Sequence, residues 1–108
     1  MKFNTKLLEG EWFEYKNKKE KLDFLIRPFP NSKHPFKVTG DLTVGDYNWT
    51  VFRECVLDWK GVEDKDGKEL VCNISNKLIL FDLDSKLFDF VSEKQNELRN
   101  RQEVEIKN

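Results

Sequence analysis

The pattern of apolar and polar residues predicts a β-hairpin near the beginning of the chain. Residues 22–27 alternate with the two-residue period of a strand. Residues 10–16 are rich in aromatic side chains, which favour strands, and a polar stretch suited to a turn separates the two segments. Pro28 and Pro30 should end the second strand, because proline cannot donate to the hydrogen-bond ladder. We therefore expect an antiparallel hairpin over about residues 10–29.

Residues 30–45 predict a loop or a short strand. Proline, serine and asparagine dominate its first part, and Gly40 and Gly45 interrupt any regular element. Residues 36–39 are suited to a short third strand. His34, the one histidine of the chain, should be an exposed loop residue.

From Asp46 onward the period becomes helical. Four large apolar residues are spaced by three, four and three positions: Trp49, Phe52, Val56 and Trp59. This spacing places them on one helix face. Asp46 or Asn48 can cap the first turn, and Gly61 is suited to follow the end of the helix.

Two further helices are expected in the last third of the chain. Asn73 or Ser75 can begin a short one over residues 76–81, and Asp84 or Ser85 can begin a longer one. The longer helix has one apolar face, which comprises Leu87, Val91 and Leu98. Beyond Val91 apolar residues become sparse, so its last turns should project into solvent or onto a partner.

Together these elements predict an α+β fold. We expect an N-terminal antiparallel β-hairpin or small sheet packed on a C-terminal set of about three helices. The chain should form a single domain over residues 1–108, with the helical part at 46–102.

Composition narrows the functional classes. The 108 residues are 36% charged with a net charge of −1, and 13% are aromatic, while alanine is absent. So many large rings argue against a disordered chain, and no apolar run approaches the ~20 residues of a membrane span. Without a signal segment, a cytoplasmic location is expected. An isoelectric point of about 5.9 argues against nucleic-acid binding.

Catalytic and metal chemistry find little support in the sequence. Cys55, Cys72 and His34 do not occur at metal-ligand spacing. If Gly67 is taken as the sixth position of a calcium loop, Val62 and Asn73 fall where carboxylates are required, at positions 1 and 12. A simple turn at Asp66-Gly67 explains that segment. We expect no catalytic residues, no metal and no cofactor.

The surplus of aromatic residues suggests protein contacts. Trp12 and Phe13 are adjacent in a predicted strand, so their side chains point to opposite faces and one lies outside a one-sided core. Phe88 and Phe90 cannot share one helix face. Aromatic residues are enriched at the centres of interfaces. The candidate partner contacts are Trp12, Phe81, Leu87, Phe88 and Phe90.

Residues 52–68 resemble a pattern in tail assembly chaperones and tail accessory proteins of bacteriophages and prophages. In those proteins a helix ends in Trp-x-Gly-Val and an acidic Asp-x-Asp-Gly turn follows. The corresponding residues are Trp59, Gly61, Val62, Asp64, Asp66 and Gly67. Their roles in the pattern are structural: the Trp fills the core, the first Gly permits a left-handed exit, and the Asp and second Gly shape the turn.

The resemblance implies a non-enzymatic phage morphogenesis protein that acts in the host cytoplasm. It would assist tail assembly by transient binding of another tail protein, possibly the tape measure, and it could form a weak homo-oligomer. Two alternatives remain at this point. One is a structural virion component, such as a head–tail connector or tail terminator, and the other is a small regulatory binding module.

Overall fold

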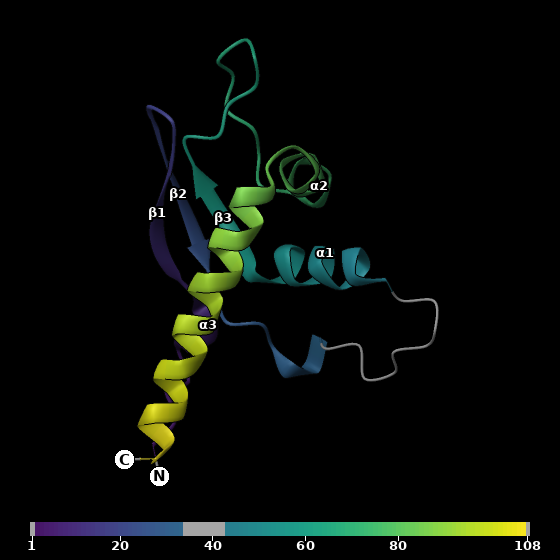
Figure 1. Ribbon diagram of the computed structural model, residues 1–108. Helices are drawn as coiled ribbons and strands as arrows, with labels where there is room; N and C mark the ends of the chain where they lie inside the picture. Colours follow the sequence, from purple (N-terminus) through teal and green to yellow (C-terminus); the bar gives the residue numbers. More distant parts are fainter. Residues whose placement is uncertain (1, 34–42, 108) are drawn as a thin grey trace.

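Three strands and three helices form an α+β fold (Figure 1) in residues 2–33 and 43–107, the part that the computed structural model describes. The strands and helices are β1 (Glu11–Asn17), β2 (Glu20–Ile26), α1 (Val44–Cys55), β3 (Val56–Lys60), α2 (Ile74–Leu83) and α3 (Ser85–Lys107). Short 3-10 turns, η1 and η2, span Leu7–Glu9 and Asn31–Lys33. The expected strand at 36–39 and His34 lie outside the described residues.

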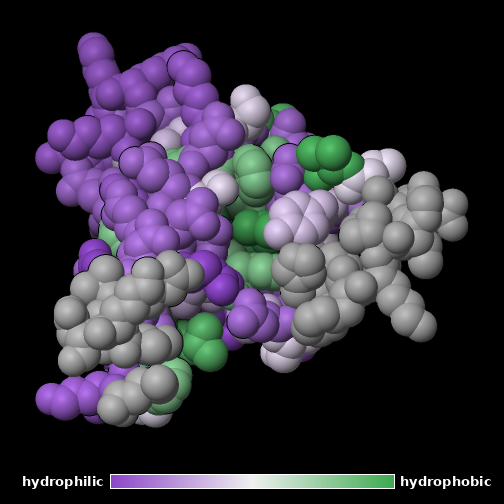
Figure 2. Space-filling model, turned by 60° about the horizontal axis from the view of Figure 1, so that its bottom comes forward, coloured by the Kyte–Doolittle hydropathy of each residue, from purple (hydrophilic) through white to green (hydrophobic). Residues whose placement is uncertain are grey.

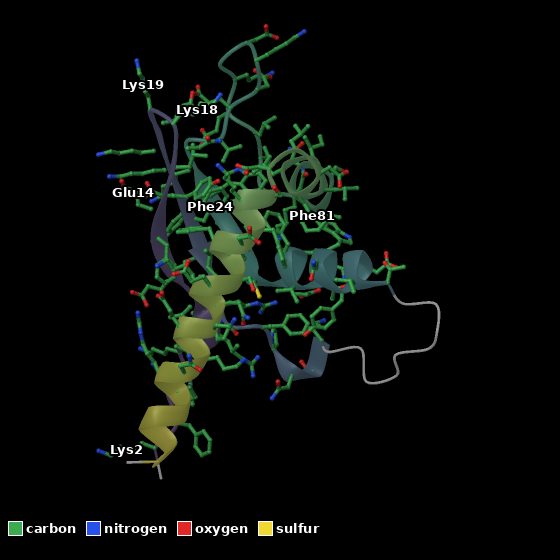
Figure 3. All side chains as sticks on the ribbon, in the orientation of Figure 1. Lys2, Glu14, Lys18, Lys19, Phe24 and Phe81 are labelled. Atoms are coloured by element: carbon green, nitrogen blue, oxygen red, sulfur yellow. The ribbon has the colours of Figure 1, made fainter. Side chains whose placement is uncertain are left out.

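The predicted hairpin is confirmed and becomes part of a three-stranded antiparallel sheet. The strand order is β1-β2-β3, so β2 is central. Lys18 adopts a positive φ of 57° in the two-residue turn between β1 and β2. Lys18 and Lys19 project from the tip of the hairpin (Figure 3), away from the core.

The helix expected to continue through Trp59 ends at Cys55, so this prediction was wrong. Residues 56–60 form β3, which pairs with β2. Ile26 pairs with Val56 and Leu25 pairs with Asp58, which leaves Leu57 as the extra residue of a β-bulge. Because the bulge absorbs one residue, Val56 and Trp59 face the core together although they are three positions apart. A bulged strand therefore reproduces the spacing of a helix.

Helix α1 begins earlier than expected. Its N-cap is Thr43, whose hydroxyl accepts a hydrogen bond from the backbone N–H of Asp46 at 3.0 Å. The Asp46 carboxylate in turn accepts from the backbone N–H of Thr43 at 3.2 Å, which completes a capping box. Asp46 is thus the third helical residue and not the cap, and Asn48 is not the cap either.

The caps of the last two helices follow the prediction. The Asn73 side chain accepts from the backbone N–H of Asn76 at 2.8 Å, so α2 begins at Ile74. The Asp84 carboxylate accepts from the backbone N–H of Leu87 at 3.1 Å at the beginning of α3. Asp84 also accepts from the Tyr15 hydroxyl at 3.0 Å and so links the beginning of α3 to β1.

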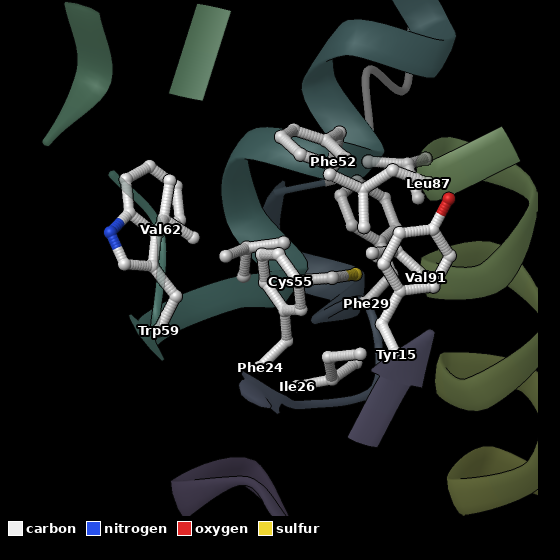
Figure 4. Packing of buried hydrophobic residues seen from close by; sticks show 12 residues of the cluster. Tyr15, Phe24, Ile26, Phe29, Phe52, Cys55, Trp59, Val62, Leu87 and Val91 are labelled. Atoms are coloured by element: carbon white, nitrogen blue, oxygen red, sulfur yellow. The ribbon is translucent and has the colours of Figure 1, made fainter. Parts of the chain in front are cut away.

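The core lies between the inner face of the sheet and the helices α1 and α3 (Figure 4). The fully buried side chains are Phe24, Ile26, Phe52, Cys55, Val56, Leu87, Val91 and Leu98. The apolar face predicted for α3 is therefore confirmed. Edge-to-face ring contacts join Phe24 to Tyr15 at 6.1 Å and to Trp59 at 6.2 Å.

The second half of α3 stays on the molecule instead of projecting from it. Leu98 is fully buried, and Gln102 accepts from the backbone N–H of Asn4 at 2.9 Å. Arg101 forms an ion pair with Glu11 at 2.6 Å. The chain's own N-terminal segment thus accompanies α3 at least to Gln102, near the lower end of Figure 1.

Candidate protein-binding surface

The motif of residues 59–67 has a structural role. Trp59 is buried, and its ring N–H donates to the backbone oxygen of Leu70 at 2.7 Å. Gly61 has a φ of +86°, which supports the expected left-handed exit, although it follows a strand and not a helix. A side chain at Gly61 would lie 3.4 Å from the backbone oxygen of Lys21. These residues fix the path from β3 into the following turn.

The acidic turn uses its carboxylate internally. Asp64 Oδ1 accepts hydrogen bonds from the backbone N–H groups of Asp66 at 2.8 Å and Lys68 at 3.0 Å. Gly67 has a φ of +80° and donates its N–H to the backbone oxygen of Asp64. This geometry matches the simple turn expected from Asp66-Gly67. Within the described part of the chain, no three His, Cys, Asp or Glu side chains gather as a metal-binding group.

Most of the candidate partner contacts lie in or against the core. Leu87 is 1% exposed, so its side chain is a core residue and is not available to a partner. Phe81 is half-buried and contacts Phe52 at 5.6 Å and Phe88 at 5.7 Å between ring centres. Phe90 is also half-buried and contacts the Tyr15 ring at 5.0 Å. Much of the aromatic surplus therefore packs within the molecule.

Trp12 is the most exposed of the candidate partner contacts. Its side chain is 40% exposed, and the Lys60 ammonium lies 4.3 Å above its ring. Phe13, on the opposite face of β1, packs against the core as a half-buried residue. Trp12 is therefore the outward-facing ring of the adjacent pair.

Helix α2 carries several exposed aliphatic side chains that are not among the candidate contacts. No residue of this helix is buried, although its sequence is strongly apolar. The exposed large side chains of the helix are Ile74, Leu78, Ile79 and Leu83, and Val71, which precedes the helix, is exposed as well. We call them, with Ser75 and Asp82 between them, the outer face of α2. Leu83 is 81% exposed and Ile74 is 64% exposed.

The inner side of α2 holds the outer face in place. Leu80 and Phe81 pack against the core, and α2 contacts both α1 and α3. The Lys77 ammonium donates to the backbone oxygen of Arg53 at 3.1 Å. The Asn76 amide donates to the backbone oxygen of Val71 at 2.8 Å. The outer face is thus presented by a helix anchored from behind.

A signal for this surface was present in the sequence. Residues 74–83 are apolar on every side of a helix, and a helix of that kind is normally buried all round. The chain has only two other helices in its described part to cover it. One side of α2 therefore remains open.

A second apolar region lies at the opposite end of the molecule. A groove of about 570 Å³ is lined in part by Phe3, Leu8, Phe29 and Arg99. Arg99 is already engaged by the backbone oxygen of Phe29 and the side chain of Asn31. Figure 2 turns this lower side forward and shows a band of hydrophobic surface (green) beside the hydrophilic half (purple). Apolar exposure is therefore not confined to α2.

Burial raises the pKa of three side chains in or against the core. Burial raises the pKa of the Cys55 thiol to about 12. Burial, with the hydrogen bond to Asp84, raises the pKa of the Tyr15 hydroxyl to about 12 as well. Burial also raises the pKa of Cys72. These shifts suit packing residues, because a nucleophilic cysteine needs a lowered pKa.

Comparison with protein-family models, curated proteins and solved structures finds no significant match for this chain. No helix in the described residues is both long and apolar enough to cross a membrane.

Proposed function

We propose that this protein works by binding another protein through the outer face of α2 and that it is not an enzyme. The exposed aliphatic side chains of α2 are the observation that supports this most strongly. Exposed apolar patches of this kind mark interaction sites, because leaving them in water is unfavourable. The partner would present an apolar helix or groove, since the outer face is an anchored helix with two rows of aliphatic side chains.

For the biological setting we propose tail assembly of a bacteriophage or prophage. The support is the sequence resemblance of residues 52–68, in which the acidic turn of Asp64 and Gly67 has the expected form. In this chain, however, Trp59 lies within a strand and Gly61 follows that strand, where the pattern has a helix. The protein would cover apolar surface of a tail protein, such as the tape measure, in the host cytoplasm until that protein polymerises.

Co-expression with individual phage tail proteins, followed by affinity capture, tests the proposal. Leu78→Glu places a charge in the middle of the outer face, and we expect it to abolish capture. Val44→Glu is the matched control, because Val44 is 78% exposed in the first turn of α1, where an acid is well tolerated. Equal capture by both variants would contradict the role of α2, and no capture of any tail protein by the wild type would contradict the setting.

A further inference from the structure

The outer face of α2 has the same order of apolar and polar residues in both directions along the helix. From its beginning to its end the exposed residues are Ile74, Ser75, Leu78, Ile79, Asp82 and Leu83. In kind these are apolar, polar, apolar, apolar, polar and apolar. With ~100° between successive residues, all six fall on one half of the helix surface. The face is therefore symmetric about a point between Leu78 and Ile79.

We infer that two copies of this chain bind each other through α2, with the two helices antiparallel. A two-fold axis at the level between Leu78 and Ile79 places Leu78 opposite Leu78 of the second copy, and Ile79 opposite Ile79. Ile74 and Leu83 lie ~180° apart around the helix, so they form the two edges of the contact. An isologous dimer requires a self-complementary surface of this kind.

The polar residues of the face also find partners in this arrangement. The two-fold axis places Ser75 of each copy opposite Asp82 of the other. The Ser75 hydroxyl donates to the Asp82 carboxylate, twice by symmetry. A parallel arrangement would instead bring the two Asp82 carboxylates together and repel. The antiparallel register therefore satisfies both the apolar and the polar positions.

The size of the face suits a second copy of the chain. The exposed aliphatic side chains leave roughly 600 Å² open, which is at the upper end of what a monomeric protein shows in one patch. A stable interface buries about 800 Å² on each partner. The aliphatic residues supply most of that area, and the polar residues between them add to it.

The dimer rests on the proposed function in that both use the outer face of α2. The second copy would keep this face out of water until the partner protein displaces it. Dimer and partner complex would then exclude each other.

A pair of single variants tests the dimer and its register together. Leu78→Glu and Leu78→Lys introduce good helix formers at an exposed position of α2, so both should fold. Alone, each sets two like charges against each other and should sediment as a monomer of 12.9 kDa, whereas the wild type should sediment at twice that mass. When the two variants are mixed, the carboxylate introduced at position 78 of one copy faces the ammonium introduced at position 78 of the other. The mixture should therefore form a heterodimer.

The outcomes separate this inference from the proposed function. A wild type that remains monomeric at high micromolar concentration overturns the dimer, even if Leu78→Glu still abolishes capture of a tail protein. A dimer that neither variant disrupts also overturns it. Two monomeric variants that fail to recombine overturn the antiparallel register. Circular dichroism of each variant, alone and mixed, checks that the fold is retained.

Discussion

Two consecutive helices of this protein use their apolar residues in opposite ways. Helix α3 buries Leu87, Val91 and Leu98 almost completely, while α2 buries none of its residues. Both helices begin with the side chain of an Asn or Asp as their cap, and Asp84 joins them. Capping and position in the chain therefore do not explain the difference.

The difference comes from how the apolar residues are placed around each helix and from which other elements pack against them. In α3 the apolar residues form one stripe among charged residues, and the sheet and α1 cover that stripe. In α2 aliphatic residues lie on every side, but only the side facing α1 and α3 is covered. An apolar residue of α3 therefore stabilises the fold, whereas one on the outer face of α2 is available for binding.

Leu87→Ala should have the largest effect, because it removes a fully buried side chain from α3. We expect the free energy of unfolding to fall by about 2–5 kcal/mol, as for other leucines in cores. Urea unfolding followed by circular dichroism measures it. Its neighbour Lys86 is exposed, so Lys86→Ala should stay within about 0.5 kcal/mol of the wild type. Similar losses for both variants would contradict the one-sided burial of α3.

Gly61→Ala should have the next largest effect, because Gly61 directs the chain from β3 toward α2. At a φ of +86° a side chain is strained, which costs about 1–2 kcal/mol. Gly45 provides the control: it lies inside α1, and Gly45→Ala should be neutral or stabilising by up to ~1 kcal/mol. If both substitutions have the same sign in urea unfolding, the role of Gly61 in the turn is wrong.

Alkaline pH should weaken the junction between β1, α2 and α3. The pKa of Tyr15 is raised to about 12 in the folded protein, from about 10 for an unperturbed tyrosine. Its contribution to stability is therefore complete below pH 10 and is lost as the pH rises from 10 to 12. The loss is at most about 1.4 kcal/mol per pH unit for one group.

The Cys55 thiol adds to this loss at alkaline pH. Its folded pKa is also about 12, so its contribution begins to fall from about pH 9. Urea unfolding at several pH values measures the combined slope. Tyr15→Phe should have a shallower slope between pH 10 and 12 only. An unchanged slope in that variant would show that Tyr15 does not contribute.

The sequence predicted the elements whose signals are local. The hairpin followed from strand alternation, and the buried face of α3 followed from helical spacing. The caps at Asn73 and Asp84 followed from side-chain chemistry. The strand β3 was missed because the bulge at Leu57 gave Val56 and Trp59 a helical spacing. That bulge depends on pairing with β2, which lies far away in the sequence.

The candidate contacts were less predictable for a physical reason. Whether an aromatic or aliphatic residue is exposed depends on which elements cover it. Phe81 and Phe88 contact each other and pack against the core, and Leu87 is buried. The more exposed residues Ile74 and Leu83 belong to a helix whose sequence alone suggests a buried element.

The smallest effect on stability is expected for Leu83→Lys, and this variant tests the central claim most directly. Leu83 is 81% exposed on the outer face of α2. We expect its free energy of unfolding to stay within about 0.5 kcal/mol of the wild type, while sedimentation shows that association with a second copy is weakened, because the charge lies at the edge of the contact. A loss of stability comparable to that of Leu87→Ala, or association that persists unchanged, would contradict the claim that this face serves binding and not folding.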